Sequence, residues 1–123
     1  MGKDMITLEE FEQGIKTADP TENCPVSKTL QLLNGKWTSR IIFVLQKSET
    51  IRFSQLKRNL KDITNTMLSS TLKSLEDAGL VKRQQFDEMP VRVEYSLTEA
   101  GREMLPIYYE MAKWGSKHFH IEL

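Results

Sequence analysis

The sequence contains one cysteine and few glycines and prolines, and each of these scarcities excludes a class of protein. One thiol per chain cannot form an internal disulfide framework or a cysteine-rich zinc site. With 6 glycines and 4 prolines among 123 residues, the chain is neither collagen-like nor broadly disordered. Its length suits a single folded domain.

Long hydrophobic runs are absent as well. The longest run of aliphatic and aromatic residues spans residues 41–45, far short of the roughly 20 residues that cross a bilayer. The N-terminus also lacks the basic start and apolar stretch of a secretory signal. We therefore expect a soluble, cytoplasmic protein that makes no contact with membranes.

The formal net charge is zero, but the charges are segregated along the chain. Residues 1–23 carry 2 basic and 6 acidic residues, residues 36–83 carry 10 basic and 4 acidic residues, and residues 84–123 carry 4 basic and 7 acidic residues. A basic segment between acidic flanks would concentrate positive potential where a nucleic acid binds. A lysine-rich helical surface exposed to solvent would give the same counts, so charge alone leaves both interpretations open.

Two helices are predicted near the N-terminus. The first follows Thr7, which together with Glu10 forms a capping box, and it must end before Pro20. Residues 18–23 are expected to be a linker. The second helix begins at Cys24-Pro25, because proline suits the first helical position and leaves Cys24 as the N-cap.

The central segment predicts a helix-turn-helix. Residues 36–46 have helical apolar spacing, residues 51–52 suit a very short strand, and residues 53–60 form a further helix. A turn then leads to a helix over residues 64–78, which Gly79 ends in the left-handed cap position. Two helices joined by a short turn are the helix-turn-helix pattern.

The remaining residues predict a wing and a closing helix. Residues 80–86 and 91–97 suit the two strands of a hairpin, and Thr98 caps the last helix, which Pro106 should bend near Arg102. The expected fold is mainly α with a small β-hairpin wing, that is, a winged helix-turn-helix. Its expected organisation is an N-terminal extension (1–23), a winged domain with a dimerisation helix (24–115) and a tail (116–123).

The last helix also predicts self-association. Apolar residues recur at heptad spacing from Ala100 to Trp114, which is wide enough to face both a core and a partner helix. One small domain has little core with which to cover this seam and the apolar side of the first helix. We predict a dimer through the terminal helices, with contacts from Leu8, Phe11, Ile107, Met111 and Trp114.

The helix over residues 64–78 is the candidate recognition helix, since its outward side offers short polar groups that can reach base edges or phosphates in the major groove. Basic and polar residues nearby suit phosphate contact, and Arg92 of the hairpin could enter the adjacent minor groove. Any one of these side chains could equally belong to a solvated surface. The predicted DNA-binding set is Arg52, Ser54, Lys57, Thr64, Asn65, Thr66, Ser69, Ser70, Lys73 and Arg92.

Cys24 is a candidate reactive thiol. The N-terminus of a helix favours negative charge and so favours the thiolate over the thiol. The alternative is a small residue that caps or packs at a helix start. His118 and His120 form only a weak metal signal, and no glycine-rich phosphate loop or catalytic set is evident. We expect neither an enzyme nor a bound metal or cofactor.

A series of short motifs occurs in order along residues 24–115: Cys24-Pro25-Val26, Gly35-Lys36-Trp37, Arg52-Phe53-Ser54-Gln55-Leu56, Leu72-Lys73-Ser74-Leu75-Glu76, Gly79-Leu80-Val81, Arg92-Val93-Glu94-Tyr95-Ser96-Leu97-Thr98 and Gly101. This ordered series resembles the HxlR-type winged-helix transcriptional regulators, relatives of the MarR group. The resemblance implies a homodimer that binds a palindromic operator in double-stranded DNA and controls its own gene or a neighbouring stress or detoxification gene. It also implies that Cys24 matches a cysteine which, in several members, senses small electrophiles or oxidants.

Two departures from the family pattern are evident. Members often carry proline, a basic residue, glutamine and arginine where this chain has Asn65, Thr66, Ser70 and Thr71, so its recognition helix is less basic than usual. Some redox-responsive members pair the N-terminal cysteine with a different cysteine of the partner subunit, and this chain has no second cysteine.

The sequence thus favours a dimeric, sequence-specific repressor or activator that responds to electrophile or oxidant stress through Cys24. The main alternative is a winged-helix module that binds protein and not DNA, which the zero net charge keeps open. A thiol-dependent enzyme would need a base near Cys24, and the sequence offers no candidate.

Overall fold

The computed structural model describes residues 5–19 and 24–122, and the chain divides into two compact units. The first extends to Gln31 and the second begins at Leu32. The sequence placed the boundary after residue 23, whereas most of the helix that follows Cys24 belongs to the first unit. Residues 20–23 of the predicted linker lie outside the described residues.

The first unit contains α1 (Leu8–Thr17) and most of α2 (Pro25–Leu32). The predicted capping box is confirmed, because the Glu10 N–H donates to Thr7 Oγ1 and the Thr7 N–H donates to the Glu10 carboxylate, both at 3.0 Å. No residue of α1 is buried. The apolar side of α1 is therefore exposed in the single chain.

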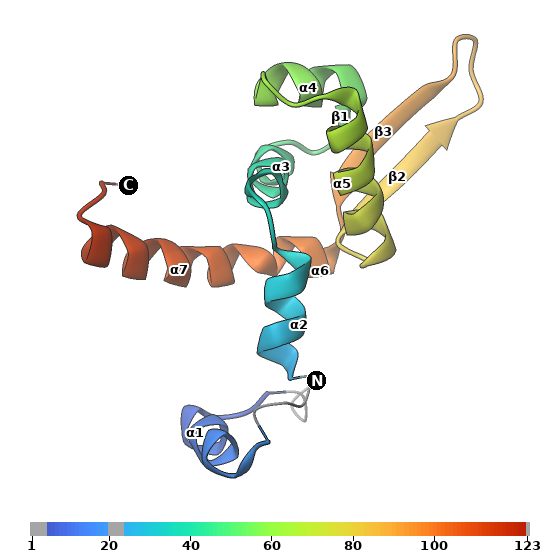
Figure 1. The fold of residues 1–123 in the computed structure, drawn as a ribbon. Helices are drawn as coiled ribbons and strands as arrows, with labels where there is room; N and C mark the ends of the chain where they lie inside the picture. The colour runs from blue at the N-terminus through green and yellow to red at the C-terminus, as the bar shows by residue number, and fades with distance from the viewer. Residues whose placement is uncertain (1–4, 20–23, 123) are drawn as a thin grey trace. The chain divides into compact units, whose positions relative to one another are not determined.

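The second unit is a winged helix-turn-helix, as the sequence predicted. Figure 1 shows α5 between α4 and a long β-hairpin, with α7 running from α6 past α3 and away from the hairpin. Its elements in chain order are α3 (Lys36–Gln46), β1 (Ile51–Arg52), α4 (Phe53–Leu60), α5 (Asn65–Asp77), β2 (Val81–Phe86), β3 (Arg92–Leu97), α6 (Glu99–Arg102) and α7 (Met104–Phe119).

The core of this unit lies where α3, α4 and α5 meet the sheet. Each of the three helices contributes at least one buried apolar side chain, and the three buried leucines of α5 are the ones that its helical spacing predicts. This packing fixes which side of α5 is left outside. The largest fully buried side chains are Ile41, Ile42, Leu45, Leu56, Leu68, Leu72 and Leu75.

The sheet has three strands, because the short strand predicted at residues 51–52 joins the two strands of the predicted hairpin. β3 pairs antiparallel with β2 over its whole length, and β1 pairs with the other side of β3 through Ile51 opposite Tyr95. Local turn chemistry predicts the β2–β3 hairpin, but the β1–β3 pairing joins distant segments and has no local signal. The added strand ties the start of α4 to the wing.

The closing helix is divided in two at Glu103, close to the predicted bend. Thr98 caps α6 by accepting the Gly101 N–H at 3.1 Å, and Pro106 cannot donate to the Arg102 carbonyl that a continuous helix would pair with it. Within α7, Met104 and Tyr108 are buried, and the Tyr108 ring packs edge-to-face on Phe43 of α3 at 5.0 Å. α7 then continues to residue 119, which lies within the segment expected to be a tail.

None of the helices in the described part of the chain combines the length and the apolar character that a bilayer-spanning segment requires.

Candidate nucleic-acid interface

The outward side of α5 presents a row of polar side chains. Thr64 begins the helix by accepting the Met67 N–H at 3.1 Å, and the three buried leucines hold its opposite side against the core. Four of the five predicted recognition residues on α5 are small, uncharged and exposed: Asn65, Thr66, Ser69 and Ser70. Side chains of this size let a helix approach base edges closely.

Lys73 is the fifth residue of this row, and it forms an ion pair with Asp77. Its ammonium nitrogen lies 3.1 Å from a carboxylate oxygen of Asp77, and both side chains are exposed. The hydrogen bond and the charge of Asp77 raise the pKa of Lys73. Lys73 is the one basic residue in the α5 sequence, so this helix offers little free positive charge to DNA.

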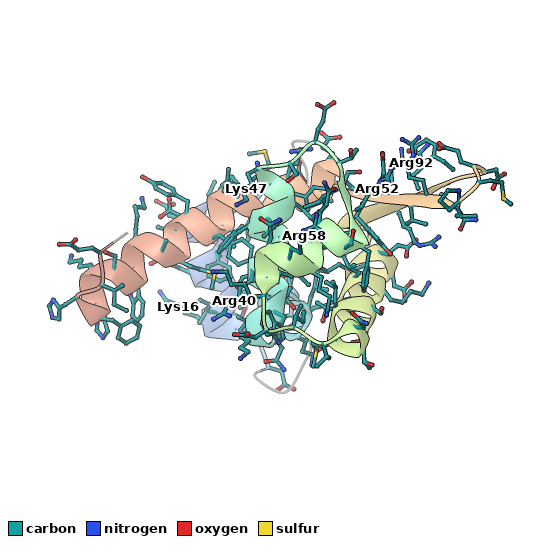
Figure 2. The ribbon with its side chains drawn as sticks, turned by 90° about the horizontal axis from the view of Figure 1, so that it is seen from above. Lys16, Arg40, Lys47, Arg52, Arg58 and Arg92 are labelled. Carbon is teal, nitrogen blue, oxygen red and sulfur yellow. The ribbon has the colours of Figure 1, made fainter. Side chains whose placement is uncertain are left out.

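The predicted phosphate-contacting residues lie at the N-cap of α4 and along this helix. Arg52 ends β1 and caps α4, and its backbone N–H donates to Gln55 Oε1 at 3.2 Å, while its side chain is free of the core and exposed. Ser54 is exposed and Lys57 is half-buried. Figure 2 shows Arg52 and Arg58 on the α4 side of the unit and Arg92 further out on the hairpin.

Arg92 of the wing is held by its neighbours. Its guanidinium lies 2.9 Å from the Glu88 carboxylate and 3.5 Å from the Glu94 carboxylate, and it stacks 4.0 Å from the centre of the Phe86 ring. The sequence predicted that Arg92 would enter the adjacent minor groove. The structure pairs the arginine with both carboxylates, so a phosphate would have to displace them to reach it.

One exposed residue of α5 escaped the sequence analysis. The Met67 side chain is 45% exposed, although it is apolar and directly precedes the buried Leu68. Helical spacing could have predicted this exposure, because Met67 does not fall on the buried stripe of Leu68, Leu72 and Leu75. Its carbonyl accepts from Ser70 Oγ at 3.1 Å, so Met67 borders the polar row, and its Sδ lies 3.6 Å from Thr71 Oγ1.

Cys24 is exposed and behaves as the N-cap that the sequence predicted. The Ser27 N–H donates to its Sγ at 3.5 Å, and the Ser27 hydroxyl lies 3.5 Å from the same sulfur. These hydrogen bonds, led by that of the Ser27 side chain, lower the pKa of the Cys24 thiol. The sequence predicted that the helix terminus would favour the thiolate, and it carried no sign of the part that Ser27 plays.

An apolar groove borders the thiol within the first unit. It encloses about 410 Å³, and both α1 and the start of α2 contribute to it. Phe11, Ile15, Val26 and Cys24 are among its lining residues. A small apolar molecule in this groove would lie next to the sulfur.

The residues predicted to form a dimer are exposed in the single chain. Leu8 is 73% and Phe11 40% exposed on α1, and Ile107, Met111 and Trp114 are 44 to 61% exposed on α7. The predicted seam is divided, because Met104 packs inward together with Tyr108, while the other three residues face out. Exposed apolar side chains recurring on one helix are typical of a protein interface.

Among the described residues, no group of three or more histidine, cysteine, aspartate or glutamate side chains is arranged to hold a metal ion.

Comparison with known proteins relates the whole second unit to one family. The model of the HxlR-like helix-turn-helix family matches residues 32–122. The chain is 42% identical over 113 residues to BH0655, an HTH-type transcriptional regulator of Halalkalibacterium halodurans, covering 92% of this chain and 97% of the relative.

Solved structures give the same picture. A MarR-family transcriptional regulator of Porphyromonas gingivalis superposes with a TM-score of 0.71 at 44% identity, covering 82% of this chain and 98% of that one. The redox regulator HypR in its oxidised form superposes with a TM-score of 0.68 at 38% identity, covering 77% and 97%.

Proposed function

The chain belongs to the HxlR-like helix-turn-helix family of transcriptional regulators, and from this premise we propose that it acts as a homodimer on a palindromic operator. In each subunit α5 enters the major groove, while β1, α4 and the wing contact the flanking backbone. Two-fold symmetry places the two copies of α5 on half-sites about one helical turn (~34 Å) apart. Ile107, Met111 and Trp114 of α7 supply the contact between subunits, joined by Leu8 and Phe11 of α1.

One observation carries the DNA-binding part of this proposal. The core fixes α5 by its leucine stripe and leaves Asn65, Thr66, Ser69 and Ser70 outside, in a unit that also exposes Arg52 at the N-cap of α4 and Arg58 in its last turn. A helix with a polar outer side beside positive charge suits insertion into a groove lined by phosphates. Thr64 belongs to this set through its position at the helix N-terminus.

Binding to DNA is tested by its dependence on salt. The full-length protein is titrated against a duplex enriched from a randomised pool, at several salt concentrations. Lys57→Ala should weaken binding to every sequence and reduce the slope of log affinity against log salt by about one, because one phosphate contact is lost. Lys113→Ala is the matched control, since it removes one positive charge from α7, and its slope should equal that of the wild type.

Cys24 gives the protein a second property in this proposal, namely a response to small electrophiles or oxidants. Its support is the pair of hydrogen bonds from Ser27, which favour the thiolate, and the apolar groove beside the sulfur. An adduct or a mixed disulfide with a small thiol is the favoured product. A Cys24–Cys24 bridge would need the two α-carbons within ~7 Å.

The thiol is tested by treating the wild type and Cys24→Ser with a quinone or with hypochlorite and then titrating operator DNA. Wild-type binding should change and that of Cys24→Ser should not. An equal response of both proteins, or of neither, would make Cys24 a structural cap. If no duplex is enriched and no salt-dependent binding is found, the protein-interaction alternative replaces the DNA-binding proposal.

A further inference from the structure

The first two turns of α5 combine an apolar side chain with two hydroxyls whose protons are already used. Met67, Ser70 and Thr71 lie at i, i+3 and i+4 spacing and so share one side of the helix. Ser70 Oγ donates to the Met67 carbonyl at 3.1 Å, and Thr71 Oγ1 donates to the same carbonyl at 2.7 Å. With their protons committed to the backbone, both oxygens are left with lone pairs only, as acceptors.

Each base pair presents a distinct pattern of groups to the major groove. Thymine carries a C5-methyl group that cytosine lacks, adenine and cytosine carry an amino donor, and guanine presents two acceptors. A hydroxyl that can only accept is suited to an amino group and not to guanine N7 or O6. An exposed methionine is suited to a methyl group, since both are apolar.

The same helix offers little that could bind guanine. The usual partner of guanine is an arginine or lysine that donates two hydrogen bonds. The single basic residue of α5, Lys73, is bound to Asp77 at 3.1 Å. Because an acceptor suits the amino group of cytosine as well as that of adenine, the preference for an A·T pair over a G·C pair comes from the methionine, which suits the thymine methyl group.

We propose that Met67 and Ser70 together select an A·T base pair in each half-site, Met67 by contact with the thymine methyl group and Ser70 by accepting from the adenine amino group. This inference rests on the proposed function, because it takes α5 to lie in the major groove. It makes Met67 a specificity-determining residue. Thr71, which is half-buried, limits the freedom of the methionine because its Oγ1 lies 3.6 Å from Sδ.

The test replaces thymine by deoxyuridine, which removes only the methyl group. A duplex enriched by the full-length protein from a randomised pool is resynthesised with one such replacement at a time. At one position per half-site, loss of the methyl group should weaken wild-type binding about fourfold, as expected for one buried methyl. A duplex with G·C in place of A·T at that position should bind more weakly. Adding the methyl group back as 5-methylcytosine should restore part of the lost affinity.

Variants assign the effect to Met67. Met67→Ala should bind the thymine and the uracil duplexes equally, while Met67→Leu should still discriminate because leucine keeps an apolar contact. Indifference of the wild type to every replacement would overturn the inference, as would unchanged discrimination by Met67→Ala. These outcomes differ from a failure of the proposed function, in which no duplex would be enriched.

Discussion

Gly101 controls how closely α6 approaches the loop that begins the wing. A β-carbon at this position would overlap the carbonyl oxygen of Leu80 and would lie 3.2 Å from its carbonyl carbon and 3.0 Å from Leu97 Cδ2. That oxygen cannot move freely, because it accepts the Thr98 N–H at 3.0 Å. Gly101→Ala must therefore displace α6 or break this hydrogen bond.

Gly101→Ala should lower the free energy of unfolding through two contributions, overpacking and the loss of a backbone hydrogen bond. Overpacking a tight site costs about 1–3 kcal/mol, and a strained or lost backbone hydrogen bond adds about 1 kcal/mol. The sum, about 3 kcal/mol, should lower the unfolding midpoint of a chain of this size by roughly 10 °C. The clash is with backbone, so no change of side-chain rotamer can relieve it.

Thermal and urea unfolding at one fixed protein concentration measure the effect, since a dimer's midpoint depends on concentration. Gly115→Ala is the matched control, because its β-carbon would meet only Phe119 Cδ2 at 3.9 Å in the interior of α7. That variant should be unchanged or up to about 1 kcal/mol more stable through higher helix propensity. A Gly101→Ala protein that unfolds with the wild type would refute the close contact.

Three further predictions concern the interfaces and the thiol. Trp114→Ala should raise the dimer dissociation constant at least tenfold by sedimentation equilibrium, because a large exposed side chain is lost from the contact, and an unchanged constant would place the interface elsewhere. Arg92→Ala should lower DNA affinity by less than tenfold, because the guanidinium must leave two carboxylates before it can reach a phosphate. Asp87→Asn should leave the affinity unchanged or improve it. Tighter binding by Arg92→Ala would contradict a DNA contact at this residue. Ser27→Ala should raise the pKa of the Cys24 thiol, because the hydrogen bonds of the serine lower it. The pH profile of the alkylation rate should then move to higher pH, and the rate at neutral pH should fall. Identical profiles of the variant and the wild type would show that the serine has no influence.

Sequence by itself determined the elements whose signals are local. Thr7, Thr64 and Thr98 each cap a helix through a hydrogen bond to a residue three positions on, so the cap and its partner are visible together in the sequence. The leucine stripe of α5 and the alternation of apolar and polar residues in the sequence of β3 are likewise periodic within one element. These signals sufficed for the winged helix-turn-helix and for the outward row of α5.

Only the tertiary structure decided which elements pair with one another and which side chains become buried. β1 joins the sheet because Ile51 pairs with the distant Tyr95. A strand of two residues is too short for its sequence to predict which segment it pairs with. The register of the hairpin likewise decides which partners Arg92 has, because it places the carboxylates of Glu94 and Glu88 beside the guanidinium. Met67 and Met104 are chemically identical, yet one lies outside and the other inside. Burial depends on what packs against each side of a helix, and that is a property of the assembled fold.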